Sequence, residues 1–327
     1  MRLQKTMTMI VATALGLATA GEIRADEVVK VDAAIPAYQK TSGVSGNLNS
    51  IGSDTMNNLM TLWAEGFAKY YPNVKVQVEG KGSSTAPPAL IAGTAQLGPM
   101  SRPMKNTEID AFETQFGHKP MALRTSLDSL AVYVNKDNPI ESLALPQVDA
   151  IFSKTRALGH KEAISTWGQV GLTGDWASRP ISLYGRNSAS GTYGFFKEHA
   201  LGTGDYRDEV KEQPGSASVV QGVTEDVGGI GYSGIGYRTS GVKPLSLATK
   251  EGGVAVVPAP ANVYNGSYPL ARFLYVYINK DPDKPLDPLL REFVKFVFAK
   301  EGQEAVVKDG YLPVPASVAQ DEIKKVQ

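Results

Sequence analysis

Segments with strand and helix patterns alternate along nearly the whole chain, without an internal repeat, a charge block or a long linker. Residues 73–79 alternate polar and apolar side chains with the period of two that is typical of a half-exposed strand. An apolar helical face comes before them, in residues 55–71, and a last helix fits residues 288–307. Such alternation predicts an α/β fold with largely parallel sheets.

Two buried strands are expected far apart in the chain. Residues 127–135 and residues 268–280 are both apolar enough for a buried strand, and we expect them to pair. The length of 327 residues suggests two domains, yet no linker separates them. We therefore expect two lobes joined by strands that cross between them, with a ligand cleft at the seam.

The composition excludes several kinds of site. Because 33 basic residues balance 33 acidic ones, a general polyanion binder is disfavoured, and we expect no nucleic-acid partner. The chain has no cysteine, which excludes disulfides, thiol catalysis, zinc–thiolate sites and lipid attachment at cysteine. The three histidines, His118, His160 and His199, lack the spacing of metal ligands. We therefore expect no metal and no cofactor.

Residues 1–25 have the layout of a secretory signal peptide. A short basic start precedes the apolar or small residues 6–20, and the small residues Ala18 and Ala20 suit a cleavage site. Cleavage is expected after Ala20 or after Ala25. This segment is too short for an ordinary membrane-spanning helix, and no later segment offers ~20 unbroken apolar residues. We therefore expect a protein that is exported, either to the periplasm or out of the cell, with no membrane insertion.

Three predicted helix starts are rich in glycine, serine and threonine. They are residues 52–55, residues 82–85 and residues 190–192, and Arg186 lies four residues before the third. One such start alone is more often a simple helix cap than a ligand site. Three of them favour a site for a small tetrahedral anion, because helix N-termini offer free N–H groups and a partial positive charge. The guanidinium of Arg186 adds a bidentate donor.

At these residues the chain resembles the PstS-type phosphate-binding proteins, the soluble receptors of phosphate ABC importers. The resemblance extends from Gly52 to about Pro315, and its most specific motif is Arg186-x-x-x-Ser190-Gly191-Thr192. The resemblance implies a two-lobed α/β fold of the type II periplasmic-binding-protein class, with an anion cleft between the lobes. It also implies inorganic phosphate as the ligand and the membrane permease of an importer as a partner.

The resemblance further implies which residues bind the anion. The implied ligands are Ser83, Arg186, Ser190, Gly191 and Thr192, with Asp54 or Thr55 from the first loop. Further candidates are Ser53, Ser84, Ser101 and Arg102.

The same resemblance implies how the chain divides. Lobe one is expected to comprise residues 26–130 and 269–327, and lobe two residues 131–268. The two lobes are expected to close on the anion by a hinge.

One position departs from the best-known family members. They carry an acidic residue, which accepts the proton of hydrogen phosphate, where this chain has Ser101-Arg102. Asp54 is the alternative acceptor, and it would favour phosphate over sulfate. Arg102 either contacts the anion or forms an ion pair with a neighbouring acid, and the sequence leaves both alternatives open.

Several motifs are closer still to a group of secreted pseudomonad phosphate-binding-like proteins, some of which are described as low-molecular-weight alkaline phosphatases. A phosphatase that uses the same anion site, with Asp54 as its nucleophile, is therefore the alternative function. No Gly-x-Ser-x-Gly elbow occurs in the chain, and no histidine pair has metal-binding spacing, so binding is the favoured function. A secreted adhesion or matrix protein that only retains the fold is a third alternative.

Two other glycine-rich segments carry weaker signals. Residues 229–234 match the Gly-x-Gly-x-x-Gly fingerprint of dinucleotide-binding sites in sequence. No helix pattern follows them, so we predict a strand and a turn instead. Residues 214–216 resemble a fourth helix start, for which we favour capping alone.

Overall fold

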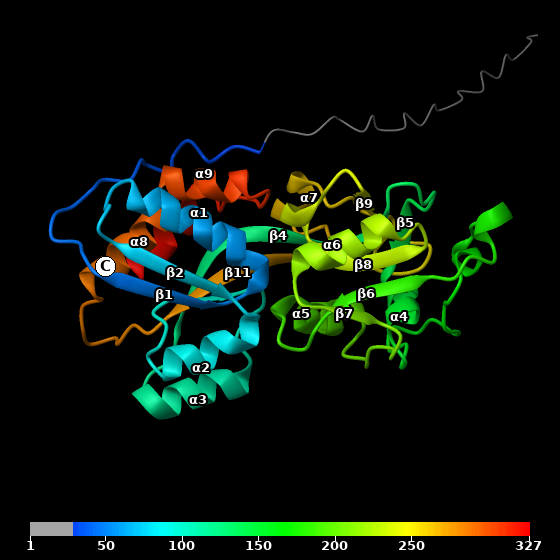
Figure 1. Ribbon diagram of the computed structural model, residues 1–327, viewed down its shortest axis with the longest axis horizontal. Coiled ribbons are helices and arrows are strands. Elements are labelled where there is room, and N and C mark those ends of the chain that lie inside the picture. Colours follow the sequence, from blue (N-terminus) through cyan, green and yellow to red (C-terminus); the bar gives the residue numbers. More distant parts are fainter. Residues whose placement is uncertain (1–28) are drawn as a thin grey trace, which may run out of the picture.

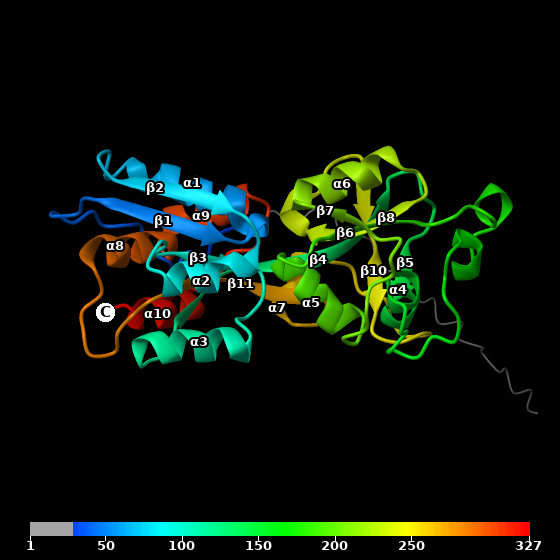
Figure 2. The same cartoon turned by 60° about the horizontal axis from the view of Figure 1, so that its bottom comes forward.

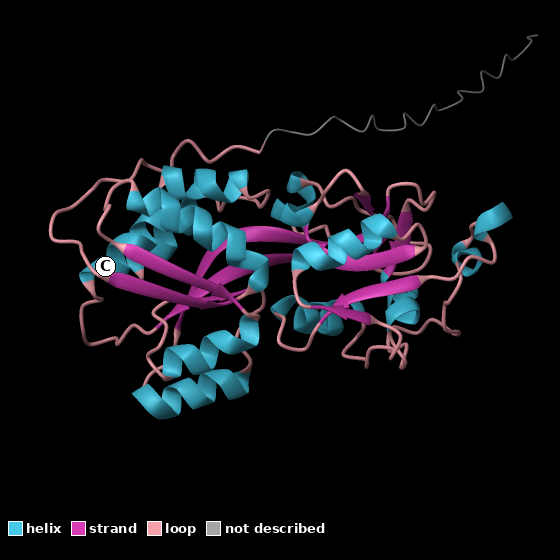
Figure 3. Ribbon diagram, in the orientation of Figure 1, coloured by secondary structure: helices cyan, strands magenta, loops and turns pink. Residues whose placement is uncertain are grey.

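The computed structural model describes residues 29–327, so the predicted signal peptide lies outside the described residues. Two lobes lie side by side along the longest axis of the molecule, and the long strand β4 (Met121–Asn135) runs from one into the other (Figure 1). Strands form the middle of each lobe and helices lie around them (Figure 3).

A seven-stranded sheet passes through both lobes in the order β3-β11-β4-β8-β6-β7, with β9 also paired to β4. Strand β4 changes partner along its length. It pairs with β11 up to Ser129 and with β8 from Leu130 onward. The other strands of this sheet are β3 (Gly98–Met100), β6 (Ser182–Arg186), β7 (Lys211–Gln213), β8 (Gly229–Gly234), β9 (Val242–Pro244) and β11 (Ala271–Ile278).

The predicted pairing of the two distant buried strands is confirmed, since β11 lies antiparallel to β4. The prediction of largely parallel sheets is wrong for the central sheet, where β3, β11, β4, β8 and β9 form antiparallel ladders and β6 is parallel to β7 and β8. The chain leaves one lobe along β4 and returns along β11, so these strands run in opposite directions. Two small parallel sheets consist of β1 (Asn47–Gly52) with β2 (Lys75–Gly80) and of β5 (Ser142–Ala144) with β10 (Ser246–Ala248).

Helices lie on both sides of the strands (Figure 2). None of the helices in residues 29–327 is both long enough and apolar enough to cross a membrane. The α-helices are α1 (Asn57–Ala68), α2 (Ala86–Ile91), α3 (Asn106–Phe116), α4 (Leu145–Phe152), α5 (Gly191–Ala200), α6 (Ser216–Glu225), α7 (Pro260–Tyr264), α8 (Pro288–Val297), α9 (Lys300–Lys308) and α10 (Ala316–Lys324).

The last predicted helix is in fact two helices. Helix α8 ends at Val297 and α9 begins at Lys300, so the prediction of one helix over residues 288–307 is wrong. The turn lets both helices pack on α1, where Phe67 contacts the ring of Phe293 and Trp63 Nε1 donates to Gly302 O. The apolar pattern continues through this turn, which is why periodicity alone does not reveal it.

The glycine-rich residues 229–234 form β8, and a short 3₁₀ turn at Ile235–Tyr237 follows them. The predicted strand and turn are confirmed, in place of a dinucleotide-binding helix start.

Candidate functional site

The three predicted helix starts lie at the seam between the lobes. The first follows β1 as a 3₁₀ turn at Asp54–Met56, and the second is a 3₁₀ turn at Ser83–Thr85 before α2. The third begins α5 in the other lobe, where Ser190 is the N-cap and its Oγ accepts from Tyr193 N. The backbones of the second and third starts touch, because Ser84 N donates to Ala189 O at 3.1 Å.

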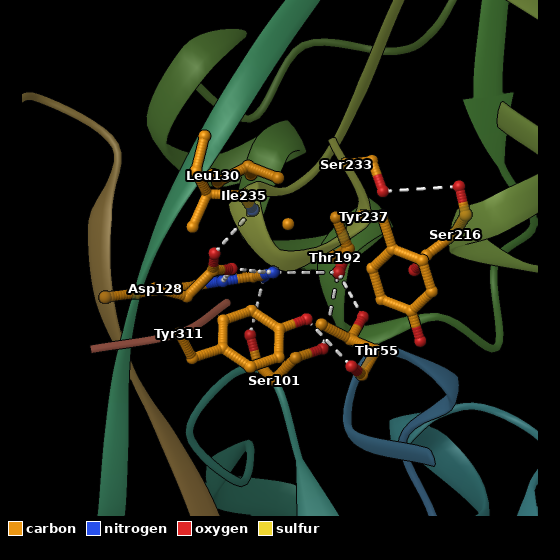
Figure 4. Close-up of polar contacts among 12 residues, drawn as sticks. Thr55, Ser101, Asp128, Leu130, Thr192, Ser216, Ser233, Ile235, Tyr237 and Tyr311 are labelled. Carbon is orange, nitrogen blue, oxygen red and sulfur yellow. Dashed lines mark hydrogen bonds and ion pairs between the residues drawn. The ribbon is translucent and has the colours of Figure 1, made fainter. Parts of the chain in front are cut away.

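Four hydroxyl groups from separate chain segments meet at this seam. Figure 4 shows three of them, on Thr55, Ser101 and Thr192. Thr55 Oγ1 lies 2.9 Å from Thr192 Oγ1, which in turn lies 3.4 Å from Ser101 Oγ. Ser83 Oγ lies 3.3 Å from Ser101 Oγ and accepts from Ser101 N at 3.0 Å. All four side chains are buried. We call this set, Thr55, Ser83, Ser101 and Thr192, the hydroxyl cluster.

Gly191 lies against Ser83 and Ser101, the two serines that the opposite lobe contributes to the hydroxyl cluster. A β-carbon added at this position would fall 2.2 Å from Ser83 Oγ and 2.7 Å from Ser101 Oγ. No side chain fits there, so glycine allows the N-terminus of α5 to approach the first lobe closely.

Arg186 ends β6 and is almost fully buried, with 1% of its surface exposed. Its Nη1 donates to Ser216 Oγ at 2.7 Å and its Nη2 to Pro214 O at 3.2 Å, while Nε is buried without a hydrogen-bond partner within residues 29–327. Burial lowers the pKa of Arg186, and the negative charge of Asp54 opposes this effect. An arginine remains protonated near neutral pH, so the seam holds a buried cation.

Asp54 connects the two lobes. Its Oδ2 lies 3.2 Å from Arg186 Nη2 and accepts from Ser216 N at 2.8 Å, and its backbone O accepts from Tyr237 Oη at 3.0 Å. These contacts place the carboxylate beside Arg186 at the edge of the buried region, where 24% of the side chain is exposed.

Ser216 also belongs to the site, so the prediction that residues 214–216 only cap a helix is wrong. Gly215 is the N-cap of α6 and no side chain caps this helix. Ser216 instead accepts from Arg186 through its side chain and donates to Asp54 through its backbone.

Arg102 takes the ion-pair alternative in the structure. Its two Nη atoms donate to the two carboxylate oxygens of Glu108 at 2.7 and 2.6 Å, and Nη2 also donates to Ser84 Oγ. Burial alone would raise the pKa of Glu108, but the hydrogen bonds from Arg102 and from Lys105 N outweigh it and lower the pKa. Arg102 therefore anchors the loop between β3 and α3.

The remaining candidate residues, Ser53 and Ser190, lie next to residues already described at the seam. Ser53 is buried, its N donates to Pro99 O at 2.8 Å, and its Oγ has no hydrogen-bond partner within the described chain. Ser190 is 2% exposed at the start of α5. The structure thus brings every candidate residue of the sequence analysis to the seam or, for Arg102, to its edge.

Sequence reasoning missed a buried ion pair beneath the hydroxyl cluster. Arg272 of β11 pairs with Asp128 of β4 through Nε and Nη2, at 2.9 and 2.8 Å from Oδ2. The available signal was a single acidic residue in the predicted strand 127–135 and a single arginine in the predicted strand 268–280. When two apolar strands form a ladder, opposite charges buried within them are expected to form an ion pair with each other.

The three histidines stay away from these contacts. His199 lies on α5, where its ring stacks on Phe195. Among residues 29–327, no group of three or more histidine, aspartate or glutamate side chains is arranged to hold a metal ion.

Comparison with known proteins identifies the family. The model of the PBP superfamily domain matches residues 37–301. The phosphate-binding protein PstS of Pseudomonas aeruginosa is 57% identical over 326 residues, an overlap that covers all of this chain and 99% of the relative. The chain belongs to the PstS family.

Solved structures share the fold. A protein of Clostridium perfringens whose structure contains bound phosphate matches with a TM-score of 0.70 and 24% identity, over 82% of this chain and all of the other. A phosphate transport receptor of Vibrio cholerae matches with a TM-score of 0.64 and 22% identity, over 82% of this chain and all of the other. The fold is therefore the two-lobed α/β type II periplasmic-binding-protein fold.

Proposed function

We propose that this protein is an exported receptor that binds inorganic phosphate and delivers it to the permease of a phosphate ABC importer. One observation carries the proposal: where the two lobes touch, the buried guanidinium of Arg186 contacts Asp54, whose neighbour Thr55 belongs to the hydroxyl cluster. A buried cation surrounded by hydroxyl and N–H groups suits a small oxyanion, because each hydrogen bond is stronger in the absence of water. The P. aeruginosa relative is itself named a phosphate-binding protein.

In this proposal the anion contacts groups from both lobes. The first lobe contributes Thr55 and Ser83, and the second contributes Arg186 and the N-terminus of α5. The proposed ligands at that N-terminus are Ser190, Gly191 and Thr192.

Asp54 is the proposed acceptor for the proton of hydrogen phosphate. Its Oδ2 is bound to Arg186 and Ser216, which leaves Oδ1 to accept that proton. Fully ionised sulfate has no proton to donate, so a carboxylate at this position repels sulfate more than it repels hydrogen phosphate. The phosphatase alternative needs the same carboxylate as a free nucleophile, and the bonds from Arg186 and Ser216 make Asp54 a poor one.

The proposed lobe boundaries follow the crossover of the chain. Lobe one comprises residues 26–130 with 269–327, and lobe two comprises residues 131–268. In support, β4 changes partner after Ser129, and Leu130 N donates to Leu270 O where the chain returns. Export to the periplasm or beyond the cell rests on the signal-peptide pattern of residues 1–25.

Replacing Arg186 with alanine tests the proposal. We expect Arg186→Ala to weaken phosphate binding by roughly a hundredfold or more in isothermal titration calorimetry, since it removes the buried cation of the site. Arg207→Ala is the matched control, because Arg207 is a half-buried arginine of the second lobe that bonds Ile164 O and Ser165 Oγ. Equal phosphate affinity in the two variants would remove Arg186 from the site.

A further inference from the structure

The Asp128–Arg272 ion pair lies where β4 passes between the lobes. Asp128 precedes the change of partner at Ser129 and Leu130, and Arg272 is paired to it across the β11–β4 ladder. Both residues are buried, with exposed fractions of 0% and 6%. Burying two charges costs free energy that only close pairing and further hydrogen bonds offset, so each remaining contact of the pair is informative.

The other contacts of the pair reach both lobes. Arg272 Nη1 donates to Ser101 O at 2.8 Å in the first lobe, and Nη2 donates to Thr192 Oγ1 at 3.0 Å in the second. Asp128 Oδ1 accepts from Ile235 N of the second lobe at 2.9 Å. Figure 4 shows Asp128 on one side of the hydroxyl cluster, with Thr192 and Ser101 facing it. The pair therefore contacts two members of the hydroxyl cluster and has hydrogen-bond partners in both lobes.

The direction of one hydrogen bond follows from chemistry alone. A guanidinium has donors and no acceptor, so Thr192 Oγ1 accepts from Arg272. The single hydrogen of the Thr192 hydroxyl must then point to another acceptor. In the structure that acceptor is Thr55 Oγ1 at 2.9 Å or Ser101 Oγ at 3.4 Å, and a bound anion would offer a better one.

We propose that Arg272 is a positioning residue of the phosphate site, which makes Thr192 a hydrogen-bond donor to the anion and holds Ser101 beside it. Asp128 fixes the guanidinium and neutralises it, so the site gains an oriented donor without net charge. This inference rests on the proposed function, because it takes phosphate as the ligand.

The test removes both charges together, so that no unpaired charge stays buried. Asp128→Asn/Arg272→Gln is compared with Arg124→Gln/Glu322→Gln, which neutralises a pair between β4 and α10 that joins the buried carboxylate of Glu322 to a half-buried arginine. Phosphate dissociation constants and thermal midpoints are measured for both. We expect a phosphate dissociation constant raised about tenfold or more in the first variant and within about twofold of wild type in the control.

A double-mutant cycle with Thr192→Val separates positioning from a general loss of stability. In the wild-type background Thr192→Val should weaken phosphate binding, whereas in Asp128→Asn/Arg272→Gln its further effect should be several-fold smaller. Undiminished phosphate affinity in Asp128→Asn/Arg272→Gln, or equal effects of Thr192→Val in both backgrounds, would overturn the inference while leaving phosphate binding intact. Wild-type protein that binds no phosphate would overturn the proposed function and this inference together.

Discussion

Burial makes the ionisation of the Asp309 carboxyl group sensitive to pH near neutrality. Asp309 follows α9, its Oδ2 is buried without a hydrogen-bond partner in the described part of the chain, and burial raises its pKa to about 7. Its backbone O faces Gly236 of the second lobe. Its negative charge adds to the raised pKa of Tyr237 and of Tyr311, for which burial is the largest cause. Asp309 thus places a carboxyl group that favours its neutral form at the contact between the lobes.

This raised pKa predicts a pH dependence with a definite sign. The folded protein binds the proton of Asp309 more tightly than the unfolded chain, whose ordinary pKa is 3.8, so this contribution to stability is complete below about pH 4 and is lost as the pH rises through about 7. Asp309→Asn keeps the side chain neutral at every pH. We expect its free energy of unfolding to exceed that of wild type increasingly with pH, by roughly 1–3 kcal/mol more at pH 8 than at pH 5.

Urea denaturation of both proteins at the two pH values measures this difference. A difference in the free energy of unfolding that is the same at pH 5 and pH 8 would show that Asp309 ionises normally in the folded protein.

Single residues also mark the limit of sequence-based prediction. The helix starts that contain Ser83, Ser190 and Thr192 could be predicted from the sequence, because capping is local: a few neighbouring residues decide where a helix begins. Asp128 and Arg272 lie 144 positions apart, and their contact depends on the register of two strands. For Ser216 the sequence predicts only a capping role, since nothing near it in the sequence indicates that Arg186 donates to it.

At the scale of elements, periodicity predicts what a segment is better than where it goes. The apolar face of α1 and the alternation of β2 follow from local patterns, and the structure contains both elements. The same patterns do not encode strand direction, so the antiparallel centre of the large sheet was missed. They also do not encode the turn between α8 and α9: the apolar pattern continues through it, while both helices pack on α1.

At the scale of the whole molecule, the backbones of the two lobes touch at Gly82 and Ser84. Gly82 has φ +111° in the first lobe, and a β-carbon added there would fall 2.6 Å from Ala189 O of the second lobe. Beside it, Ser84 N donates to the same carbonyl. An added methyl group at residue 82 therefore cannot fit while the lobes are closed.

We expect Gly82→Ala to hold the lobes apart and to weaken phosphate binding by about tenfold or more, because the anion must contact both lobes at once. Small-angle X-ray scattering should give a larger radius of gyration for Gly82→Ala with phosphate than for wild type with phosphate. Gly93→Ala is the matched control, because Gly93 also has a positive φ, +69°, but no atom lies within 4 Å of an added β-carbon. Its strain should cost about 1 kcal/mol of stability and leave phosphate affinity unchanged. Identical scattering and affinity in the two variants would refute this role of Gly82.

Calorimetry on wild-type protein that has been unfolded, freed of phosphate and refolded tests the central claim most directly. Phosphate and sulfate are titrated separately into the same preparation, and turnover of p-nitrophenyl phosphate is assayed beside them. The account predicts one phosphate bound per chain, much weaker binding of sulfate, and no turnover. An absence of phosphate binding, or turnover that disappears in Arg186→Ala, would contradict it.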